Sequence, residues 1–169
     1  MLKFIRRILI ITGVIVAFGS CNTVNDDRIP SYPVNLDLSN WSTYGVSAIG
    51  DYKVFIAALR EPRNFYFSTN TRTGFGGVLL VSGQNPFTLE VEPMAYDLAC
   101  PVECSPDVRV KMQPDGPLPV AVCEKCGSHF NVVMRGGTPE SGPAHSRKLG
   151  LRRYECRKTV SGGYLIVNN

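Results

Sequence analysis

Val34-Asn35-Leu36-Asp37-Leu38 indicates the fold class, because apolar and polar residues alternate strictly along it. A period of two is typical of a β-strand with one buried face and one face in water. Parts of residues 52–56 and 88–91 repeat the pattern, and no window of the chain shows a sustained helical period. Short runs rich in β-branched residues follow at 77–81 and 120–122. We therefore predict an all-β domain, a small sandwich or a partly open barrel.

The first 20 residues have the organisation of a bacterial signal peptide. A positively charged start is followed by an apolar run at 8–18, which is too short to cross a membrane. The run ends in Phe18-Gly19-Ser20-Cys21, which resembles a lipobox, with phenylalanine where leucine is usual. We predict that residues 1–20 are cleaved and that acyl chains on Cys21 anchor the protein in a lipid membrane. An ordinary secretory signal is the alternative.

The charge of the chain argues against nucleic-acid binding. The net charge of the chain is +4, and Lys3, Arg6 and Arg7 of the signal supply three of these charges. No basic surface of the kind that binds nucleic acid is indicated. Residues 21–33 are polar and contain prolines and an acidic pair, so they are predicted to form a lipidated tether. We expect an outer-membrane lipoprotein, on the periplasmic or the surface face.

The chain has six cysteines, and five remain if Cys21 is lipidated, so they cannot all form internal disulfides. Four of these form two closely spaced pairs, Cys100-Pro-Val-Glu-Cys104 and Cys123-Glu-Lys-Cys126-Gly127. The glycine after the second pair allows a tight turn that directs both sulfurs at one ion. We predict that Cys100, Cys104, Cys123 and Cys126 bind a metal at the tips of two hairpin loops. Cys156 is predicted to be a buried apolar residue.

Two other uses of the cysteines stay open. A disulfide such as Cys100–Cys123 would join the two loops and stabilise the fold by about 2–4 kcal/mol in an oxidising compartment. Cys123 and Cys126 would alternatively make a thiol–disulfide exchange pair. No Ser-His-Asp arrangement, phosphate-binding glycine motif or paired carboxylates stand out, so an enzyme is the less favoured interpretation. The glycine-rich Gly74-Phe75-Gly76-Gly77 is predicted to make a turn or bulge before a strand.

Two boxes in the C-terminal half of the chain carry a resemblance, Tyr96-Asp97-Leu98-Ala99-Cys100-Pro101-Val102 and Cys123-Glu124-Lys125-Cys126-Gly127-Ser128-His129-Phe130. They resemble the metal-binding loops of the Rieske domain of iron–sulfur proteins and ring-hydroxylating ferredoxins. A loop with Gly-Pro-Ala at 136–144 and the start of a strand at 151–154 follow in the family's order. The resemblance implies a Rieske-like domain over residues 34–169, in which the 136–144 loop covers the metal.

The ligand positions depart from the family pattern. Cys100 and Cys123 occupy the family's cysteine positions, but Val102 and Cys126 stand where the family has its two histidines. A cluster with two imidazole ligands is therefore not expected. A two-iron cluster would need Cys104 and Cys126 on its second iron and would have a potential of about −400 mV. Zinc, or no metal at all, is chemically easier outside the inner membrane.

Two functions follow from these residues. The first is a membrane-anchored, Rieske-like lipoprotein that binds a 2Fe–2S cluster or zinc, with electron transfer to a protein redox partner as one role. The second is a non-catalytic structural or interaction lipoprotein whose cysteines form disulfides. His129 and His145 are predicted to lie outside the ligand set in both cases.

Overall fold

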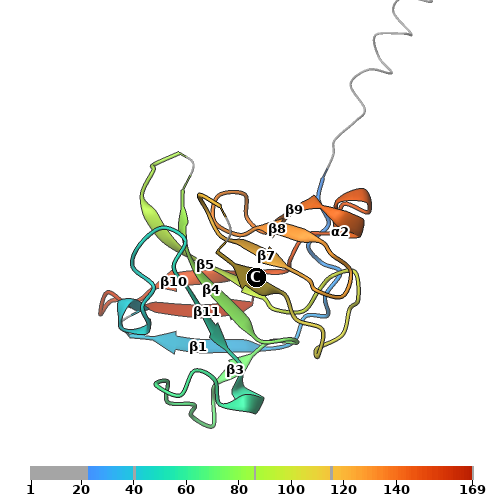
Figure 1. The fold of residues 1–169 in the computed structure, drawn as a ribbon. Coiled ribbons are helices and arrows are strands. Elements are labelled where there is room, and N and C mark those ends of the chain that lie inside the picture. The colour runs from blue at the N-terminus through green and yellow to red at the C-terminus, as the bar shows by residue number, and fades with distance from the viewer. Residues whose placement is uncertain (1–22, 40, 86, 115, 169) are drawn as a thin grey trace, which may run out of the picture.

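A computed structural model describes residues 23–168 except 40, 86 and 115, and shows a nearly all-β protein (Figure 1). The strands are β1 (Val34–Leu38), β2 (Tyr52–Phe55), β3 (Arg72–Thr73), β4 (Val78–Gln84), β5 (Val91–Asp97), β6 (Lys111–Gln113), β7 (Val120–Val122), β8 (His129–Asn131), β9 (Thr138–Ser141), β10 (Arg153–Lys158) and β11 (Tyr164–Asn168). The helical elements of the described residues are η1 (Trp41–Tyr44), η2 (Ala57–Leu59) and α2 (Gly142–Ser146). The all-β prediction is confirmed. The expected signal peptide and Cys21 lie outside the described residues.

The strands form two antiparallel sheets. The larger sheet has seven strands in the order β2-β4-β5-β10-β11-β1-β3, and it curves into a nearly closed barrel. The smaller sheet has four short strands in the order β6-β7-β8-β9 and lies against the larger one (Figure 1). Every pairing within the two sheets is antiparallel, which suits a chain whose neighbouring strands are often joined by short turns.

The predicted strands agree with the structure except at one point. In β1 the side chains of Val34, Leu36 and Leu38 are buried while Asn35 and Asp37 are exposed, as the alternation indicates. The prediction for residues 88–91 is wrong over its first three residues, because β5 begins at Val91. The side chain of Asn85 accepts hydrogen bonds from the amides of Phe87 and Thr88, and Leu89 has a positive φ of 60°, so a turn replaces the strand.

Strand β4 is buried on both faces, which explains why its sequence is a continuous apolar run. Val78 and Leu80 point into the interior of the seven-stranded sheet, where they pack with residues such as Ile166. Leu79 and Val81 belong to a second core between the two sheets, which also contains Cys100 and Cys123. A strand that separates two cores has no polar face and therefore no alternation.

The buried carboxylate of Asp97 fixes the chain just before the first cysteine loop. It accepts hydrogen bonds from the amides of Phe75 and Gly76 and from the hydroxyl of Tyr154. It also accepts one from the amide of Ala99 at 2.7 Å. The pKa of Asp97 is raised because burial disfavours its charge, although these donors oppose the shift. The predicted turn at Gly74–Gly77 is confirmed, and two of its amides, those of Phe75 and Gly76, donate to this carboxylate.

The folded domain begins before Val34. The amide of Asn25 donates to the carbonyl of Lys148, and the amide of Gly150 donates to the carbonyl of Asn25, both at 2.8 Å. Ile29 is completely buried, and the side chain of Arg152 donates to its carbonyl at 2.7 Å. The C-terminal part of the predicted tether is therefore a strap bound to the domain, because its backbone bonds and one apolar side chain are satisfied there.

Candidate metal centre

The first cysteine loop, residues 98–110, is a hairpin-like loop that connects the larger sheet to the smaller one. The amide of Cys100 donates to the carbonyl of Val108, and the amide of Val110 donates to the carbonyl of Leu98. A tight turn then follows, in which the amide of Cys104 donates to the carbonyl of Cys100 at 2.8 Å. The pairing on both sides of the turn holds Cys100 at a defined position at the base of the loop.

The second loop is the tip of the β7–β8 hairpin. The amide of Cys123 donates to the carbonyl of Ser128 at 3.0 Å, and the amide of Gly127 donates to the carbonyl of Cys123 at 2.8 Å. Gly127 adopts a φ of 69°, a region that residues with a Cβ enter only at a cost. Glycine therefore makes the tight turn that brings the sulfurs of Cys123 and Cys126 to the same side, as the sequence predicts.

Three of the four predicted ligands converge. The sulfurs of Cys100, Cys123 and Cys126 all lie within 4.8 Å of one another, and those of Cys100 and Cys126 are 3.6 Å apart. Zinc–sulfur bonds of about 2.3 Å in a tetrahedron place neighbouring sulfurs about 3.8 Å apart. Cys100 and Cys123 are buried and Cys126 is half-buried, so the group opens towards solvent on one side. These three cysteines lie close enough together to bind a metal ion.

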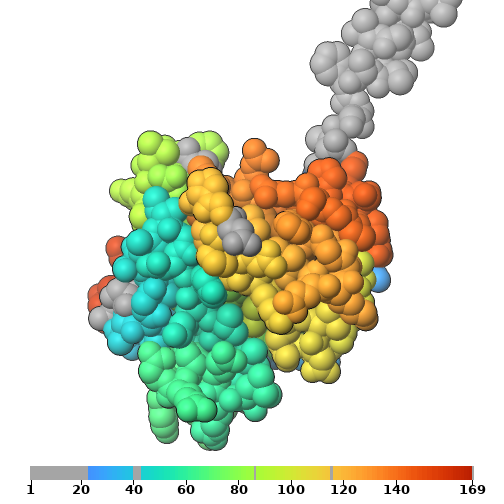
Figure 2. Space-filling model, in the orientation of Figure 1, coloured from blue at the N-terminus to red at the C-terminus, as the bar shows by residue number. Residues whose placement is uncertain are grey.

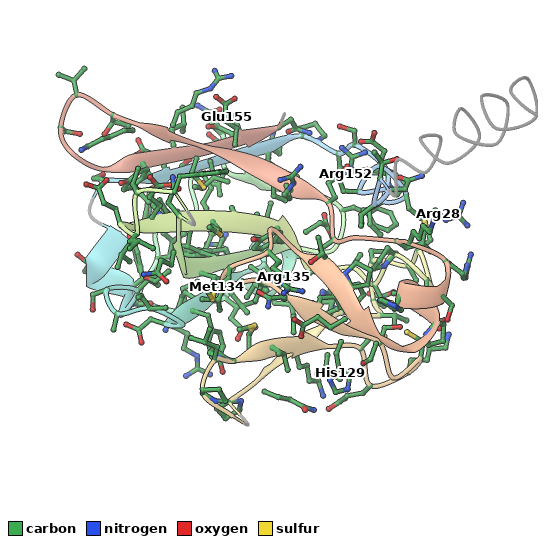
Figure 3. The ribbon with its side chains drawn as sticks, turned by 90° about the horizontal axis from the view of Figure 1, so that it is seen from above. Arg28, His129, Met134, Arg135, Arg152 and Glu155 are labelled. Carbon is green, nitrogen blue, oxygen red and sulfur yellow. The ribbon has the colours of Figure 1, made fainter. Side chains whose placement is uncertain are left out.

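Cys104 is not part of this group. Its thiol donates to the backbone carbonyl of Arg28 in the N-terminal strap, with the sulfur 3.5 Å from the oxygen. Cys104 has a positive φ of 50°, which belongs to the turn that follows Cys100. In Figure 3 Arg28 lies at the end of the molecule where the strap begins. A role for Cys104 as a ligand stays a prediction, and it would require the thiol to leave Arg28.

The described cysteines are all free thiols, and no disulfide joins them. The alternative in which Cys100 and Cys123 form a disulfide therefore has no counterpart in the structure. Burial raises the pKa of Cys100 to about 12, although the amides of Glu103 and Val102 donate to its sulfur and oppose the shift. A buried thiol of this kind is a poor nucleophile at neutral pH, but a metal would replace its proton.

Ser128 favours the thiolate form of Cys126. Burial alone would raise the pKa of Cys126, yet hydrogen bonds from the hydroxyl and amide of Ser128 lower it overall. The thiol of Cys126 donates to the oxygen of Ser128 at 3.1 Å, and the amide of Ala144 donates to the same oxygen at 3.0 Å. When Cys126 loses its proton, the hydroxyl proton of Ser128 is available to donate to the thiolate in turn. Ser128 thus stabilises the ligand form of the sulfur.

Two contacts hold the loops together around the sulfurs. Lys125 of the second loop forms a 2.6 Å ion pair with Glu103 of the first loop. Helix α2 covers the second loop through the bond from Ala144 to Ser128, and an added Cβ at Gly142 would lie 2.8 Å from the Gly127 carbonyl. The Gly-Ser after the second cysteine pair was the signal for this arrangement. The roles of Ser128, Glu103 and Lys125 depend on contacts between the two loops and α2, which the sequence alone does not predict.

The two histidines and Cys156 lie away from the three converging sulfurs. His145 faces the carbonyl of Pro139 at 3.1 Å, and His129 is half-buried on β8. Figure 3 shows His129 at the side of the smaller sheet and Glu155 of β10 at the opposite side. Neither histidine belongs to the converging group among the described residues. Cys156 is half-buried on β10, and burial raises its pKa to about 12.

No helix within the described residues has the length and apolar character needed to cross a membrane. Comparisons with protein-family models, curated proteins and solved structures gave no match.

Proposed function

We propose that this protein is a membrane-anchored lipoprotein of the bacterial envelope whose Rieske-like domain binds one metal ion through Cys100, Cys123 and Cys126. The observation that carries the proposal is the convergence of three sulfurs within 4.8 Å of one another. Two of the three thiols are buried, and each of the two loops contributes to the group. Cysteines that served only as small apolar residues would not need to face one another from two separate loops.

The donors around the sulfurs support metal binding over simple packing. The amides of Glu103 and Val102 lower the pKa of Cys100 against the effect of burial, and the hydroxyl and amide of Ser128 lower the pKa of Cys126. A neutral thiol gains little from so many donors, whereas a thiolate that ligates a cation accepts hydrogen bonds readily. The same donors tune the charge on the ligand sulfurs when metal is bound.

The spacing of the sulfurs favours a single zinc ion over a two-iron cluster. A two-iron cluster takes two protein ligands on each iron, so its four sulfurs spread along the axis that joins the irons. The described residues instead bring three sulfurs together around one point. Zinc accepts three thiolates with a fourth ligand from water or another side chain. Cys104 would be that fourth ligand only after its thiol leaves Arg28.

The Rieske-like assignment rests on the order and placement of the loops. The two cysteine boxes occupy loops whose sulfurs meet, and the Gly-Pro-Ala segment forms α2 over the second box. Electron transfer would require iron, so we propose a structural role for the metal. Bound metal would lock the first and second loops together and stabilise the smaller sheet, whose strands are only three or four residues long.

Anchoring through Cys21 is supported by the sequence Phe18-Gly19-Ser20-Cys21 and by the position of the strap. Asn25 is already bound to the domain, and it follows Cys21 by four positions. Membrane extracts treated with protease and analysed by mass spectrometry should give an N-terminal peptide that begins with diacylated Cys21. An unmodified chain that retains residues 1–20 would contradict this part of the proposal.

Metal content and absorption of the detergent-purified full chain test the metal proposal. We expect about one zinc per chain, a colourless solution and loss of the zinc in Cys123→Ser. Cys156→Ser is the matched control and should retain the metal, because Cys156 lies outside the group. Iron and acid-labile sulfide, together with visible absorption bands, would show that the site binds a two-iron cluster and not zinc. A metal-free chain with Cys100 and Cys126 joined in a disulfide would overturn the proposal and favour the structural lipoprotein.

A further inference from the structure

The outer edge of β2 lies beside a hollow of about 680 Å³ that contains none of the cysteines. Strand β2 ends the seven-stranded sheet and pairs with β4 along one edge only. The chain then passes through η2 and returns, so that the segment 59–63 forms the other wall of the hollow. Figure 2 shows this part of the chain, in turquoise, on the surface of the face drawn. The hollow therefore separates a strand edge from a loop of the same chain.

Backbone groups of β2 point into this hollow. Ile56 exchanges two hydrogen bonds with Glu61, amide to carbonyl in both directions, at 2.8 and 3.2 Å. Both groups of Ile56 thus face away from β4. Along an antiparallel strand the backbone groups of every second residue face the same edge, so those of Val54 and Tyr52 also face away from β4. Within the described residues they have no backbone partner on that side.

The hollow is also positively charged. Its lining includes Lys53, Arg60 and Arg63 against the single carboxylate of Glu61. None of these three cations makes an ion pair or a side-chain hydrogen bond with another described residue. By contrast, Arg152 and Arg153 pair with the strap, so not every cation of this protein is unpartnered. Unpaired cations that surround a hollow favour an anionic occupant.

We propose that this hollow binds an extended acidic segment of a partner protein, which adds to the free edge of β2 as a further strand. The backbone of the segment would exchange hydrogen bonds with Tyr52 and Val54, as a neighbouring strand does. Its carboxylates would pair with Lys53, Arg60 and Arg63. The two sets of contacts select for different properties of the ligand. The strand edge requires an extended backbone, and the three cations require negative charge. The proposal is independent of metal binding.

A labelled peptide of alternating glutamate and valine, added to the full chain in detergent, tests the proposal by fluorescence anisotropy. We expect a dissociation constant on the order of 100 μM that weakens as salt is added. Charge reversal at Lys53, Arg60 and Arg63 together should weaken binding by at least about tenfold. The matched control reverses three exposed cations elsewhere, Arg135, Arg147 and Lys158, and should change the affinity by less than about threefold.

A second pair of measurements tests strand addition without relying on protein variants. A peptide that is N-methylated on the residues facing β2 should bind at least about tenfold more weakly, because it cannot donate to the strand. Amide hydrogen exchange should slow at Tyr52 and Val54 when the unmodified peptide binds. Equal binding of the N-methylated peptide, equal binding of a lysine–valine peptide, or no saturable binding would each overturn the proposal. So would tight binding of polygalacturonate that leaves both amides unprotected.

Discussion

The seven-stranded sheet and the cysteine-bearing sheet are stabilised in different ways. The larger sheet encloses its own apolar core, with Leu36, Leu80 and Ile166 completely buried. The smaller sheet consists of strands of three or four residues and shares a core with the outer face of β4 and β5. Short strands bury little area of their own, so they depend on what joins them. The larger sheet should therefore fold with or without metal, and the smaller one should depend on it.

The two regions also treat buried polar groups differently. In the larger sheet, the Asp97 carboxylate has donors from two turn amides, the Ala99 amide and the Tyr154 hydroxyl, so it is satisfied by protein alone. Between the two sheets, the thiols of Cys100 and Cys126 form a hydrogen bond with each other, with their sulfurs 3.6 Å apart. Two thiolates this close would repel each other, so their deprotonated form needs a cation between them.

Removal of the metal should have the largest effect, and it should be confined to one region. With free metal about a thousandfold above its dissociation constant, chelation should lower the free energy of unfolding by about 4 kcal/mol. Amide hydrogen exchange should accelerate at Phe130 and Val122 and stay slow at Leu36 and Ile166. Equal loss of protection in both sheets would show that the sheets do not differ in their need for metal.

Two adjacent leucines on β4 belong to different cores, Leu80 to the core of the larger sheet and Leu79 to the core between the sheets. Leu80→Ala should destabilise the protein by about 3 kcal/mol, because it opens a cavity inside the larger sheet, and metal affinity should not change. Leu79→Ala should cost a similar amount, but it should also weaken metal binding, since Leu79 belongs to the core that contains Cys100 and Cys123. Thermal unfolding and competition with a zinc chelator measure the two quantities. If Leu80→Ala weakened metal binding as much as Leu79→Ala, the cores would not be separate.

Tyr154→Phe tests whether the Asp97 network serves the larger sheet alone. Loss of the hydroxyl leaves the buried carboxylate with one donor fewer, which should cost about 2 kcal/mol at neutral pH and leave zinc bound. The pKa of Asp97 in the folded protein is raised, mainly by burial, so its ionisation destabilises the fold as the pH rises. The variant raises that pKa further, because the hydroxyl had opposed the shift. Its penalty in urea unfolding should therefore shrink in acid; a penalty that grew in acid would contradict this account.

The sequence predicts what depends on local pattern. Alternation in Val34–Leu38 predicts β1, and the glycine after Cys126 predicts a turn that brings two sulfurs together. The convergence of Cys100 with that pair is also predicted, since the spacing matches two loops. The position of Cys104 is not predictable in this way, because its thiol contacts Arg28, which lies 76 residues away in sequence.

The contacts that sequence reasoning missed come from tertiary structure. The strap at Asn25 and Ile29 has the composition of a linker, and only its pairing with Lys148 and Gly150 makes it part of the domain. The free edge of β2 follows from its place at the end of the seven-stranded sheet, which no local pattern indicates. Burial of β4 on both faces likewise depends on the second sheet. Such features require knowledge of which segments meet.

Ser128→Ala should have the smallest effect and test the cysteine site most specifically. The variant removes the hydroxyl that bonds to the Cys126 thiol and would donate to its thiolate, so it should weaken zinc binding by about tenfold, with little change in the unfolding of the larger sheet. Ser141→Ala is the matched control, because Ser141 is exposed and makes no side-chain capping bond.

The metal-free protein separates the two explanations for such a loss. Because Ser128 lowers the pKa of Cys126, its removal should raise that pKa, and alkylation of the Cys126 peptide by iodoacetamide should require higher pH. A depressed thiol pKa stabilises the fold above the pKa of the unfolded chain, and this contribution is lost as the pH falls through the folded value. The stability difference between wild type and Ser128→Ala should therefore widen in alkali. An unchanged alkylation profile together with weaker zinc binding would mean that Ser128 acts by holding α2 in place through Ala144, and that the hydroxyl does not tune the sulfur.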